Sequence, residues 1–388
     1  MVQTVAVPAP PRAAAGGWWM SWRERWRDWR NRRVADPEFQ QQAAAWALTR
    51  PLVRRDAARL FDLMAGFVYS QVLLACVRLK LFDRLAEGPL PVARLGEATG
   101  LADEPLRRLL AAAVSLELLD WRSGDRIALG RLGAPMPGQR GIAAMVEHHA
   151  TLYADLADPL ALLRRESRPA MAGYWPYAEA EGTTPAALAP EHVADYSQLM
   201  SASQPLVTAE VLAAWDFSRH RVLLDVGGGE GSFLMAVARQ APDLRLMLFD
   251  LPAVAQRAHA RLVGAGLGDR AQAHGGDFFR DELPTGADLV SLVRVAFDHP
   301  DERVLRLLQS VRRALPPGGT VLLAEPMSGV KGAEAMGDAY FGMYLLAMGR
   351  GRPRTAEELG ALLRAAGFPQ VRQVPTRMPL QAGLIAAR

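Results

Sequence analysis

The chain has 388 residues, half of them hydrophobic, and a formal net charge of +4. This length corresponds to two or three domains of about 150 residues each, with enough apolar sequence for cores that need no disulfides. The one cysteine, Cys76, cannot form an internal disulfide, which indicates an intracellular protein. We expect no secretory signal and no apolar run of the about 18 residues that a membrane span needs.

The first 36 residues are predicted to form a disordered segment followed by a basic helical arm. Residues 1–17 are rich in Ala, Pro and Gly, which favours disorder. In the next stretch, WWMSWRERWRDWRNRR, tryptophans recur at helical spacing at Trp18, Trp22, Trp26 and Trp29. Seven arginines against Glu24 and Asp28 give the first 33 residues a charge of +5, so the charge excess of the chain lies here.

Two interpretations of this arm stay open. A basic helix with a tryptophan stripe is typical of peripheral membrane contact, with the rings at the level of the lipid headgroups. Alternatively, the stripe packs against the body of the protein or against a partner subunit. Nucleic-acid binding would explain the arginines, but phosphate contacts do not require five tryptophans within twelve residues.

Residues 37–139 are predicted to form a helical domain that ends in a short β-hairpin. An apolar helix covers 57–79, another helix covers 103–120, and a hairpin follows over 121–130. Helix-turn-helix with a wing is a layout of DNA-binding regulators, which is one alternative function. The second helix is apolar where base-reading side chains would be polar, so we predict a winged-helix-like dimerisation domain with no nucleic-acid partner. The apolar surplus between residues 40 and 120 predicts a homodimer.

Residues 140–206 are predicted as a helical linker that also forms a wall of the substrate pocket. His148 and His149 are adjacent in it. Neighbouring residues on a helix point to different sides, so we expect two buried histidines with satisfied partners rather than a metal pair. We place His149 in the pocket wall and predict that the protein binds no metal.

Residues 207–388 alternate strands and helices, which predicts an α/β domain with a doubly wound sheet. The apolar strand at 222–224 runs through Asp225 and Val226 into three glycines, and a helix opens at Ser232. Strand, glycine turn and helix N-terminus form a nucleotide-binding unit. Ser232 stands where the dinucleotide fingerprint has its third glycine, which favours S-adenosylmethionine (SAM) over NAD and disfavours an oxidoreductase.

Two acidic residues follow the next two strands. Asp250 ends the second strand about twenty residues after the glycines, where an acid commonly binds the ribose hydroxyls. Asp277 follows the third strand, where it can accept a hydrogen bond from the adenine amino group while Phe278 covers the ring. A further buried strand is expected over 287–297.

The segments DVGGGEG, LFDLP, GGDFF, PPGG and RTAEEL stand in the order of one family. Over residues 40–388 the chain resembles the class I SAM-dependent O-methyltransferases related to caffeic acid and acetylserotonin O-methyltransferases. The resemblance implies a C-terminal Rossmann-like sheet that binds SAM, behind the dimerisation domain. It also implies a set of SAM-contacting residues, with the two serines near the methionine end: Gly227, Gly229, Asp250, Asp277, Phe278, Ser201 and Ser203.

The chain departs from the family where the family has its catalytic base. The family strand ends in Leu-His-Asp-Trp, and here Ala296, Phe297, Asp298 and His299 occupy those positions. Phe297 cannot accept a proton. A second family acid falls on Pro353, whereas Glu325 is kept. Three features narrow the resemblance: this change, the 325–355 stretch and the tryptophan arm. By them the chain most resembles the 1-hydroxycarotenoid O-methyltransferases of purple bacteria, which methylate a tertiary alcohol.

The resemblance therefore implies methylation of a hydrophobic small molecule, an acyclic carotenoid, by a protein that is cytoplasmic or peripheral on the inner photosynthetic membrane. A soluble polyketide or aromatic hydroxyl is the alternative substrate. Phe297 and Phe341 would form apolar walls of the pocket. His299 is the candidate proton acceptor, leaving the strand end on the same side as Phe297, with Asp298 facing away toward the cofactor; alternatively, His299 is a surface loop residue.

Overall fold

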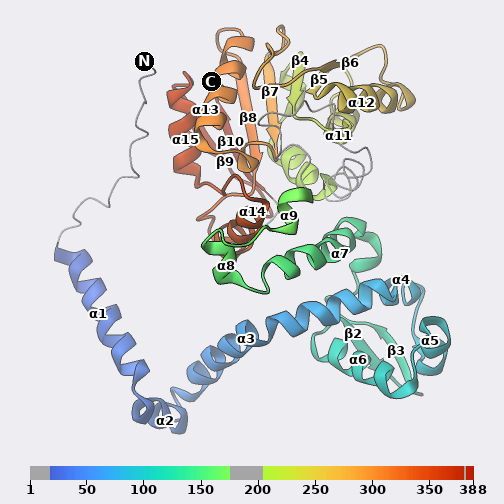
Figure 1. The fold of residues 1–388 in the computed structure, drawn as a ribbon, viewed down its shortest axis with the longest axis vertical. Helices are drawn as coiled ribbons and strands as arrows, with labels where there is room; N and C mark the ends of the chain where they lie inside the picture. The colour runs from blue at the N-terminus through green and yellow to red at the C-terminus, as the bar shows by residue number, and fades with distance from the viewer. Residues whose placement is uncertain (1–17, 175–203, 380–381) are drawn as a thin grey trace. The chain divides into compact units, whose positions relative to one another are not determined.

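The computed structural model describes residues 18–174, 204–379 and 382–388 (Figure 1). The segment 1–17, predicted to be disordered, and the two candidate serines, Ser201 and Ser203, lie outside the described residues. The chain divides into two compact units, Met1–Leu73 and Leu74–Arg388.

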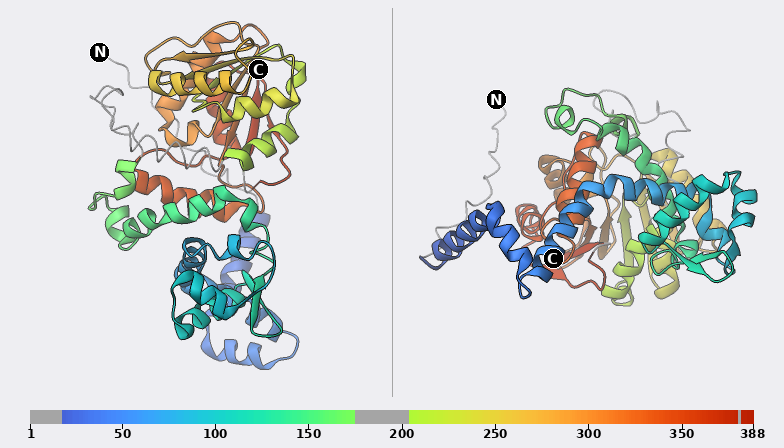
Figure 2. Two further views of the ribbon diagram at one scale, coloured as in Figure 1. Left: turned by 90° about the vertical axis from the view of Figure 1, so that its right-hand side faces the viewer. Right: turned by 90° about the horizontal axis from the view of Figure 1, so that it is seen from below.

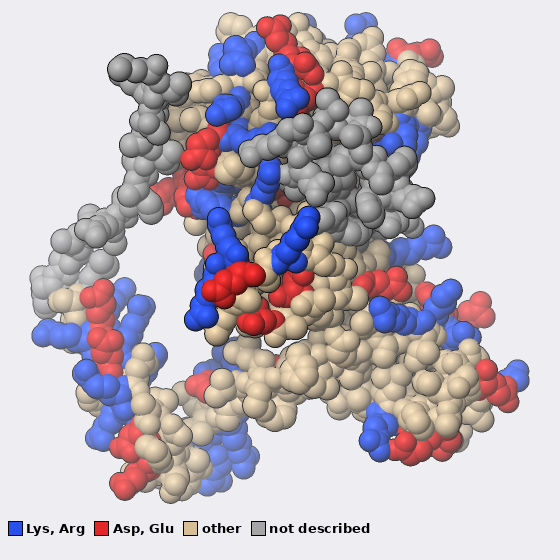
Figure 3. Space-filling model, in the orientation of Figure 1, with Lys and Arg blue, Asp and Glu red and all other residues tan. Residues whose placement is uncertain are grey.

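The described part of the first unit is helical. It consists of α1 (Trp18–Ala35), α2 (Pro37–Ala45) and most of α3 (Arg50–Arg78). Asp36 caps α2 by accepting a hydrogen bond from the backbone N–H of Glu38 at 3.0 Å. The predicted helix of the arm is present, and Trp22, Trp26 and Trp29 are about half exposed along it. Figure 3 shows basic side chains over much of the surface of α1.

Helix α3 carries a large exposed apolar surface. Among the described residues it is the one helix that is long and apolar enough to cross a membrane, and most of its apolar stretch is exposed. The expectation that no run reaches that length is wrong, because residues 60–77 are mostly apolar and hold one charged side chain, Asp62. Four of its most exposed apolar side chains share one helical face: Leu60, Leu63, Met64 and Phe67.

The second unit begins with the winged-helix-like domain. After α4 (Leu81–Arg84), the helices α5 (Val92–Thr99) and α6 (Asp103–Ser115) precede a three-stranded sheet of order β1-β3-β2. Its strands are β1 (Leu90–Pro91), β2 (Leu119–Arg122) and β3 (Arg126–Leu129). The apolar face of α6 is buried in the core of this domain at Leu106 and Leu110. Arg107 is held by Asp103 and Asp125 at 2.9 and 2.7 Å, so its charge is already paired.

A helical segment connects this domain to the large sheet. It contains α7 (Arg140–Asp155), α8 (Pro159–Leu163), α9 (Ala170–Tyr174) and helical backbone over 204–214. Asp158 caps α8, with its carboxylate accepting from the N–H groups of Leu160 and Ala161. Asp155, at the end of α7, accepts from the first two N–H groups of α9 at 2.7 and 2.9 Å, which ties the two helices together.

The large sheet has seven strands in the order β6-β5-β4-β7-β8-β10-β9. They are β4 (Val222–Val226), β5 (Arg245–Asp250), β6 (Ala271–Gly275), β7 (Leu289–Val293), β8 (Thr320–Glu325), β9 (Val371–Val374) and β10 (Gly383–Ala387). The first five in chain order are parallel, and β10 pairs antiparallel with both neighbours. The doubly wound sheet predicted from the sequence is confirmed.

Helices cover both faces of this sheet (Figures 1 and 2). On one face lie α11 (Ser232–Gln240) and α12 (Pro252–Gly264), and on the other α13 (Asp301–Ala314) and α15 (Ala356–Ala365). A π-helical turn, Ala335–Phe341, leads into α14 (Gly342–Met348). The chain order of the strands reverses between β4 and β7, and ligands of open α/β sheets bind beyond the carboxyl ends of the strands at such a point.

Candidate active site

The glycine turn after β4 lies at the carboxyl edge of the sheet, where the chain order of the strands reverses between β4 and β7. Gly227, Gly229 and Gly231 have φ values of +70°, +56° and +79°, a conformation that favours glycine. A Cβ atom on Gly227 would lie 2.8 Å from a methyl group of Val295, whereas nothing lies within 4 Å of a Cβ built on Gly229. The backbone is therefore packed on its β7 side and open at Gly229, where a ligand can approach closely.

Asp225 lies beneath the turn, and its role was not predicted from the sequence. Its Oδ1 accepts a hydrogen bond from the Ser291 hydroxyl at 2.6 Å, while its buried Oδ2 has no partner among the described residues. A Cβ on Gly228 would lie 2.6 Å from that oxygen, so the middle glycine is required by the buried carboxyl group below it. Burial raises the pKa of Asp225 to about 7.

Asp250, at the end of β5, holds the glycine turn from the side. Its carboxylate accepts from the N–H of Gly229 at 2.8 Å and from the N–H of Leu251 at 2.7 Å. Burial raises its pKa to about 6, although these hydrogen bonds and the charge of Arg257 favour the ionised form. The structure thus joins two of the predicted cofactor residues, Gly229 and Asp250, by a direct hydrogen bond.

The loop after β6 brings together an aromatic cluster. Asp277 accepts from the N–H of Phe279 at 2.9 Å, which shapes its own turn. The rings of Phe278 and Phe279 both meet the imidazole of His299 edge-on, with centroids 5.8 and 4.9 Å apart. Arg303 lies over Phe279, 4.0 Å from the ring centroid. The predicted adenine residues therefore adjoin His299, the predicted base.

The strand predicted over 287–297 ends at Val293, because the following residues are held in a turn. Glu325, at the end of β8, accepts hydrogen bonds from three consecutive N–H groups, those of Val295, Ala296 and Phe297, at 3.0, 2.8 and 3.3 Å. Burial raises the pKa of Glu325 to about 7, although these three donors oppose the shift.

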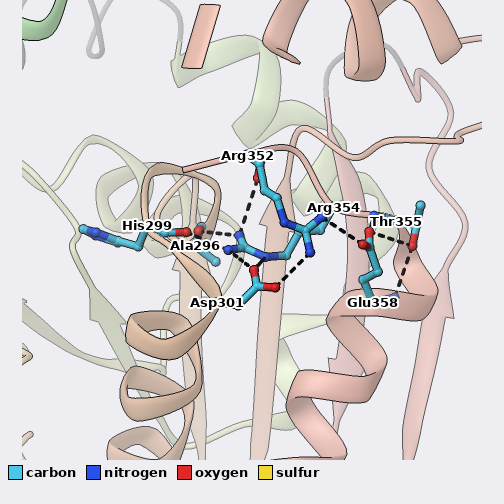
Figure 4. A network of polar contacts seen from close by, with 7 residues as sticks. All are labelled: Ala296, His299, Asp301, Arg352, Arg354, Thr355 and Glu358. Carbon is cyan, nitrogen blue, oxygen red and sulfur yellow. Dashed lines mark hydrogen bonds and ion pairs between the residues drawn. The ribbon is translucent and has the colours of Figure 1, made fainter. Parts of the chain in front are cut away.

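The carbonyl groups of the same turn are bound by Arg354, which is 1% exposed. Its guanidinium donates to the carbonyl oxygens of Ala296 at 2.9 Å and His299 at 2.6 Å (Figure 4). It also binds Asp301 at 2.7 Å. Burial raises the pKa of Asp301, but the hydrogen bonds and charges of Arg352 and Arg354 outweigh it and lower the pKa overall. The turn is therefore held from both sides. The carboxylate of Glu325 accepts from its N–H groups, and the guanidinium of Arg354 donates to its carbonyl oxygens.

The strand-like alternation expected of Phe297, Asp298 and His299 is wrong, because Ala296–Asp298 is a 3₁₀ turn. Phe297 packs edge-on against Phe341 with centroids 5.9 Å apart, while His299 lies in the separate cluster described above. His299 is 7% exposed, so it is not a surface loop residue. Burial and nearby arginines lower its pKa to about 3, which leaves it a weak base.

Asp298 is buried between these two environments. Its Oδ1 has no hydrogen-bond partner among the described residues. Burial and then the charge of Glu325 raise its pKa, and Arg294 opposes them. An unpartnered buried carboxyl oxygen at a site edge is costly unless a ligand meets it.

The two histidines of α7 contact the same segment, contrary to the expectation that they point to different sides. His148 Nε2 lies 2.9 Å from the Tyr344 hydroxyl, and His149 Nε2 lies 2.7 Å from the Tyr340 hydroxyl. Tyr340, in the π-helical turn, and Tyr344, in α14, are four positions apart, a spacing that places both on one helical face, and this face meets α7. Tyr340 also packs on Phe341 with centroids 4.9 Å apart.

Two clusters of predicted site residues thus lie at the carboxyl edge of the sheet. One holds the glycine turn with Asp250, and Phe278 with His299; the other holds Phe297, Phe341 and, through Tyr340, His149. The sequence reasoning missed Asp225, Tyr340 and Arg354. Arg354 could have been found, since it opens RTAEEL, one of the segments that carry the family resemblance.

This edge fits SAM. Three carboxyl groups with raised pKa values, Asp225, Asp250 and Asp298, lie here, and a cation favours their ionised form. SAM carries a sulfonium and an ammonium group, with ribose hydroxyls that can donate to Asp250. The open backbone at Gly229 gives room for close approach. Among the described residues, no three metal-ligating side chains gather at one place.

Comparisons with known proteins agree with this geometry. A family model described as the O-methyltransferase domain matches residues 153–369, and one described as the O-methyltransferase dimerisation domain matches residues 61–131. The chain is 46% identical over 349 residues to a demethylspheroidene O-methyltransferase of Cereibacter sphaeroides, covering 90% of this chain and 91% of the relative. The corresponding protein of Rhodobacter capsulatus is 41% identical, covering 87% and 83%.

Solved structures show the same fold. Human N-acetylserotonin methyltransferase in complex with SAM has a TM-score of 0.68 and 27% identity, covering 86% of this chain and 98% of that chain. The dimerisation domain supports a homodimer, as predicted. The predicted fold, the SAM cofactor and the O-methyltransferase activity are therefore confirmed, and the chain belongs to the family of SAM-dependent O-methyltransferases.

Proposed function

We propose that this enzyme methylates the tertiary 1-hydroxyl of an acyclic carotenoid. The observation that carries the proposal is Phe297, an apolar residue packed on Phe341 in the position of the proton-accepting histidine that the sequence resemblance implies. A phenol methyltransferase benefits from a base there, whereas a long polyene benefits from an apolar wall. The 46% identity to a demethylspheroidene O-methyltransferase supports the same substrate class.

When bound, SAM supplies an electrophilic methyl group. The residues of this chain hold the cofactor and the alcohol in line and exclude water. Gly229, Asp250 and Phe278 would hold the adenosine part, and the apolar cluster around Phe297 would hold the chain of the substrate. Orientation of this kind contributes about 7–11 kcal/mol to lowering the barrier, so a strong base is not a precondition.

Product analysis tests the substrate. The purified protein is incubated with SAM and hydroxylated acyclic carotenoids in detergent, and in parallel with a phenolic aromatic acceptor. We expect mass spectrometry to find one added methylene unit on the carotenoid and none on the phenol. Methylation of the phenol alone would overturn the proposal and favour a soluble aromatic or polyketide substrate.

We also propose that α1 binds the membrane interface, in a cytoplasmic protein peripheral on the inner membrane. The half-exposed Trp22, Trp26 and Trp29 and the surrounding arginines support this. A carotenoid dissolves in lipid, so a membrane contact would shorten its path to the enzyme.

Flotation with vesicles tests the arm. We expect the full chain to float with vesicles that contain anionic lipid, and the triple variant with Trp22, Trp26 and Trp29 replaced by alanine to stay behind. Trp46→Ala is the matched control, because Trp46 is 66% exposed outside α1. Equal flotation of the triple variant and the control would contradict the proposal and leave packing on a partner as the role of the stripe.

A further inference from the structure

Two histidine–tyrosine pairs stand side by side between α7 and the segment around α14. They have the same chemistry but different surroundings. The pair of His148 and Tyr344 is buried, with both residues less than a tenth exposed. The pair of His149 and Tyr340 is only partly buried. Only the second pair is therefore open to a ligand.

The partly buried pair adjoins the turn that follows β7. Tyr340 packs on Phe341, which packs on Phe297, with centroids 4.9 and 5.9 Å apart. The charge of Arg294, the residue after β7, acts on both Tyr340 and Asp298. The ring of Phe341 thus lies between that of Tyr340 and that of Phe297, the residue that replaces a base.

We propose that Tyr340 receives the proton of the substrate hydroxyl and passes its own proton to Nε2 of His149. The 2.7 Å separation of Tyr340 Oη from His149 Nε2 is a hydrogen-bond distance that permits this transfer. This assignment makes the two residues catalytic. It rests on the proposed function, because it takes an alcohol as the group that receives the methyl.

The step balances without a further reactant. The alcohol oxygen forms a bond to the methyl carbon as the bond from that carbon to the sulfonium sulfur breaks, which leaves neutral S-adenosylhomocysteine. The alcohol proton moves to Tyr340 Oη, and the Tyr340 proton moves to His149, which becomes an imidazolium. His149 must be neutral beforehand, and burial lowers its pKa in that direction. Burial likewise raises the pKa of Tyr340, so the phenol keeps a proton to pass on.

Single-turnover kinetics of the full chain with SAM and a hydroxylated acyclic carotenoid test this pair. We expect Tyr340→Phe and His149→Gln each to lower the rate about 10²–10⁴-fold. The double variant should fall no further than either single one, because the two groups act as a unit. The wild-type rate should show a solvent deuterium isotope effect that both variants lose. SAM affinity by calorimetry should stay within about threefold, since both residues belong to the cluster of Phe297 and Phe341 and not to that of the glycine turn and Asp250.

The neighbouring pair supplies the matched controls. Tyr344→Phe and His148→Gln remove the corresponding hydrogen bond of the neighbouring pair, and we expect less than a threefold change in rate for whichever of them folds. NMR of isotopically labelled histidine gives a readout without turnover: in SAM-free protein, Tyr340→Phe should shift the His149 signal and leave that of His299 in place.

Full rates of Tyr340→Phe and His149→Gln would overturn the inference. So would a 10²-fold loss in His299→Ala with none in Tyr340→Phe, which would assign the proton to His299 instead. If the wild type methylates only a phenolic acceptor, the proposed carotenoid function fails separately. The single variants of the two pairs are then measured with that phenolic acceptor. We expect the same loss of rate in Tyr340→Phe and His149→Gln, and full rates would again overturn the inference.

Discussion

Phe297 changes the chemistry that the site can perform. Its ring is 5% exposed and packs with the apolar side chains around Phe341. A histidine there could deprotonate a phenol, whose pKa is near 10, before methyl transfer. It could not do so for an aliphatic alcohol, whose pKa lies far above that of any side chain, so the alcohol loses its proton only as the bond to the methyl carbon forms. The residue therefore indicates the acidity of the substrate as well as its shape.

Phe297→His is expected to give no gain in the single-turnover rate on the tertiary alcohol. The new imidazole cannot ionise the alcohol before methyl transfer, and it replaces buried ring contacts by a polar group without a partner. The measurement is the rate at saturating SAM, with Phe297→Leu as the apolar control. A tenfold acceleration by histidine would show that the substrate hydroxyl is acidic and would refute the apolar-wall account of this position.

Asp225 makes the stability of the protein depend on pH. Its pKa is raised by burial from 3.8 to about 7, so between these values the folded state holds a proton that the unfolded state has lost. Stability from this group is present at acid pH and is lost as the pH rises toward 7. The slope is about 1.4 kcal/mol per pH unit.

We therefore expect Asp225→Asn to flatten the pH dependence of stability. Urea denaturation between pH 4 and 7 should show a smaller decline for the variant than for the wild type, since the amide has no proton to lose. Asp243→Asn, at an exposed position, is the control and should follow the wild type. Parallel curves for wild type and Asp225→Asn would contradict the raised pKa.

The elements differ in how far the sequence specifies them. The turn after β4 is specified locally, because positive φ values at Gly227 and Gly229 require glycine, and its position was predicted correctly. The end of β7 is not specified locally, because residues 289–297 are apolar except for Ser291 and Arg294, and local propensity continues the strand. Glu325, 28 to 30 positions away, binds the N–H groups of the turn and stops it. Such contacts from distant residues leave no local signal.

Arg354→Met is expected to destabilise the fold by about 3–5 kcal/mol, the usual loss when one partner of a buried pair is removed. The carbonyls of Ala296 and His299 would lose the guanidinium as a donor, and of its two arginine partners Asp301 would keep Arg352. Urea denaturation measures the loss. Arg352→Met is the control, because its side chain is 43% exposed and such pairs contribute about 0–1 kcal/mol. Equal losses would show that Arg354 does not hold the turn.

For the same reason, the sequence could predict which residues lie together at only some positions of the candidate site. Asp250 and Gly229 follow strand ends, so chain order alone places them at one edge of a parallel sheet. The partners of His148 and His149 lie more than 190 positions away, Tyr344 on α14 and Tyr340 on the π-helical turn before it, and nothing in the local pattern of 335–341 predicts that turn. Side-chain pairing between distant elements is thus the part that sequence patterns did not supply.

At the scale of the whole molecule, the exposed face of α3 needs a cover. Leu63 and Phe67 are 82% and 70% exposed, and large apolar side chains in contact with water on one face mark an interface. Both lie within the matched dimerisation domain, residues 61–131. A second copy of the chain is therefore the expected cover, and burying such a face contributes about 25 cal/mol per Å² of apolar surface.

The double variant Leu63→Glu with Phe67→Glu is expected to be monomeric at micromolar concentration, where the wild type is a dimer by light scattering. Dimerisation would remove this face from water and leave the two new carboxylates buried without partners. The free energy of association cannot compensate for that cost. Val263→Glu is the control, since Val263 is 50% exposed on α12, outside the dimerisation domain, and this variant should remain a dimer. A double variant that stays dimeric would show that the dimer forms through another surface and that the apolar face of α3 meets a different partner.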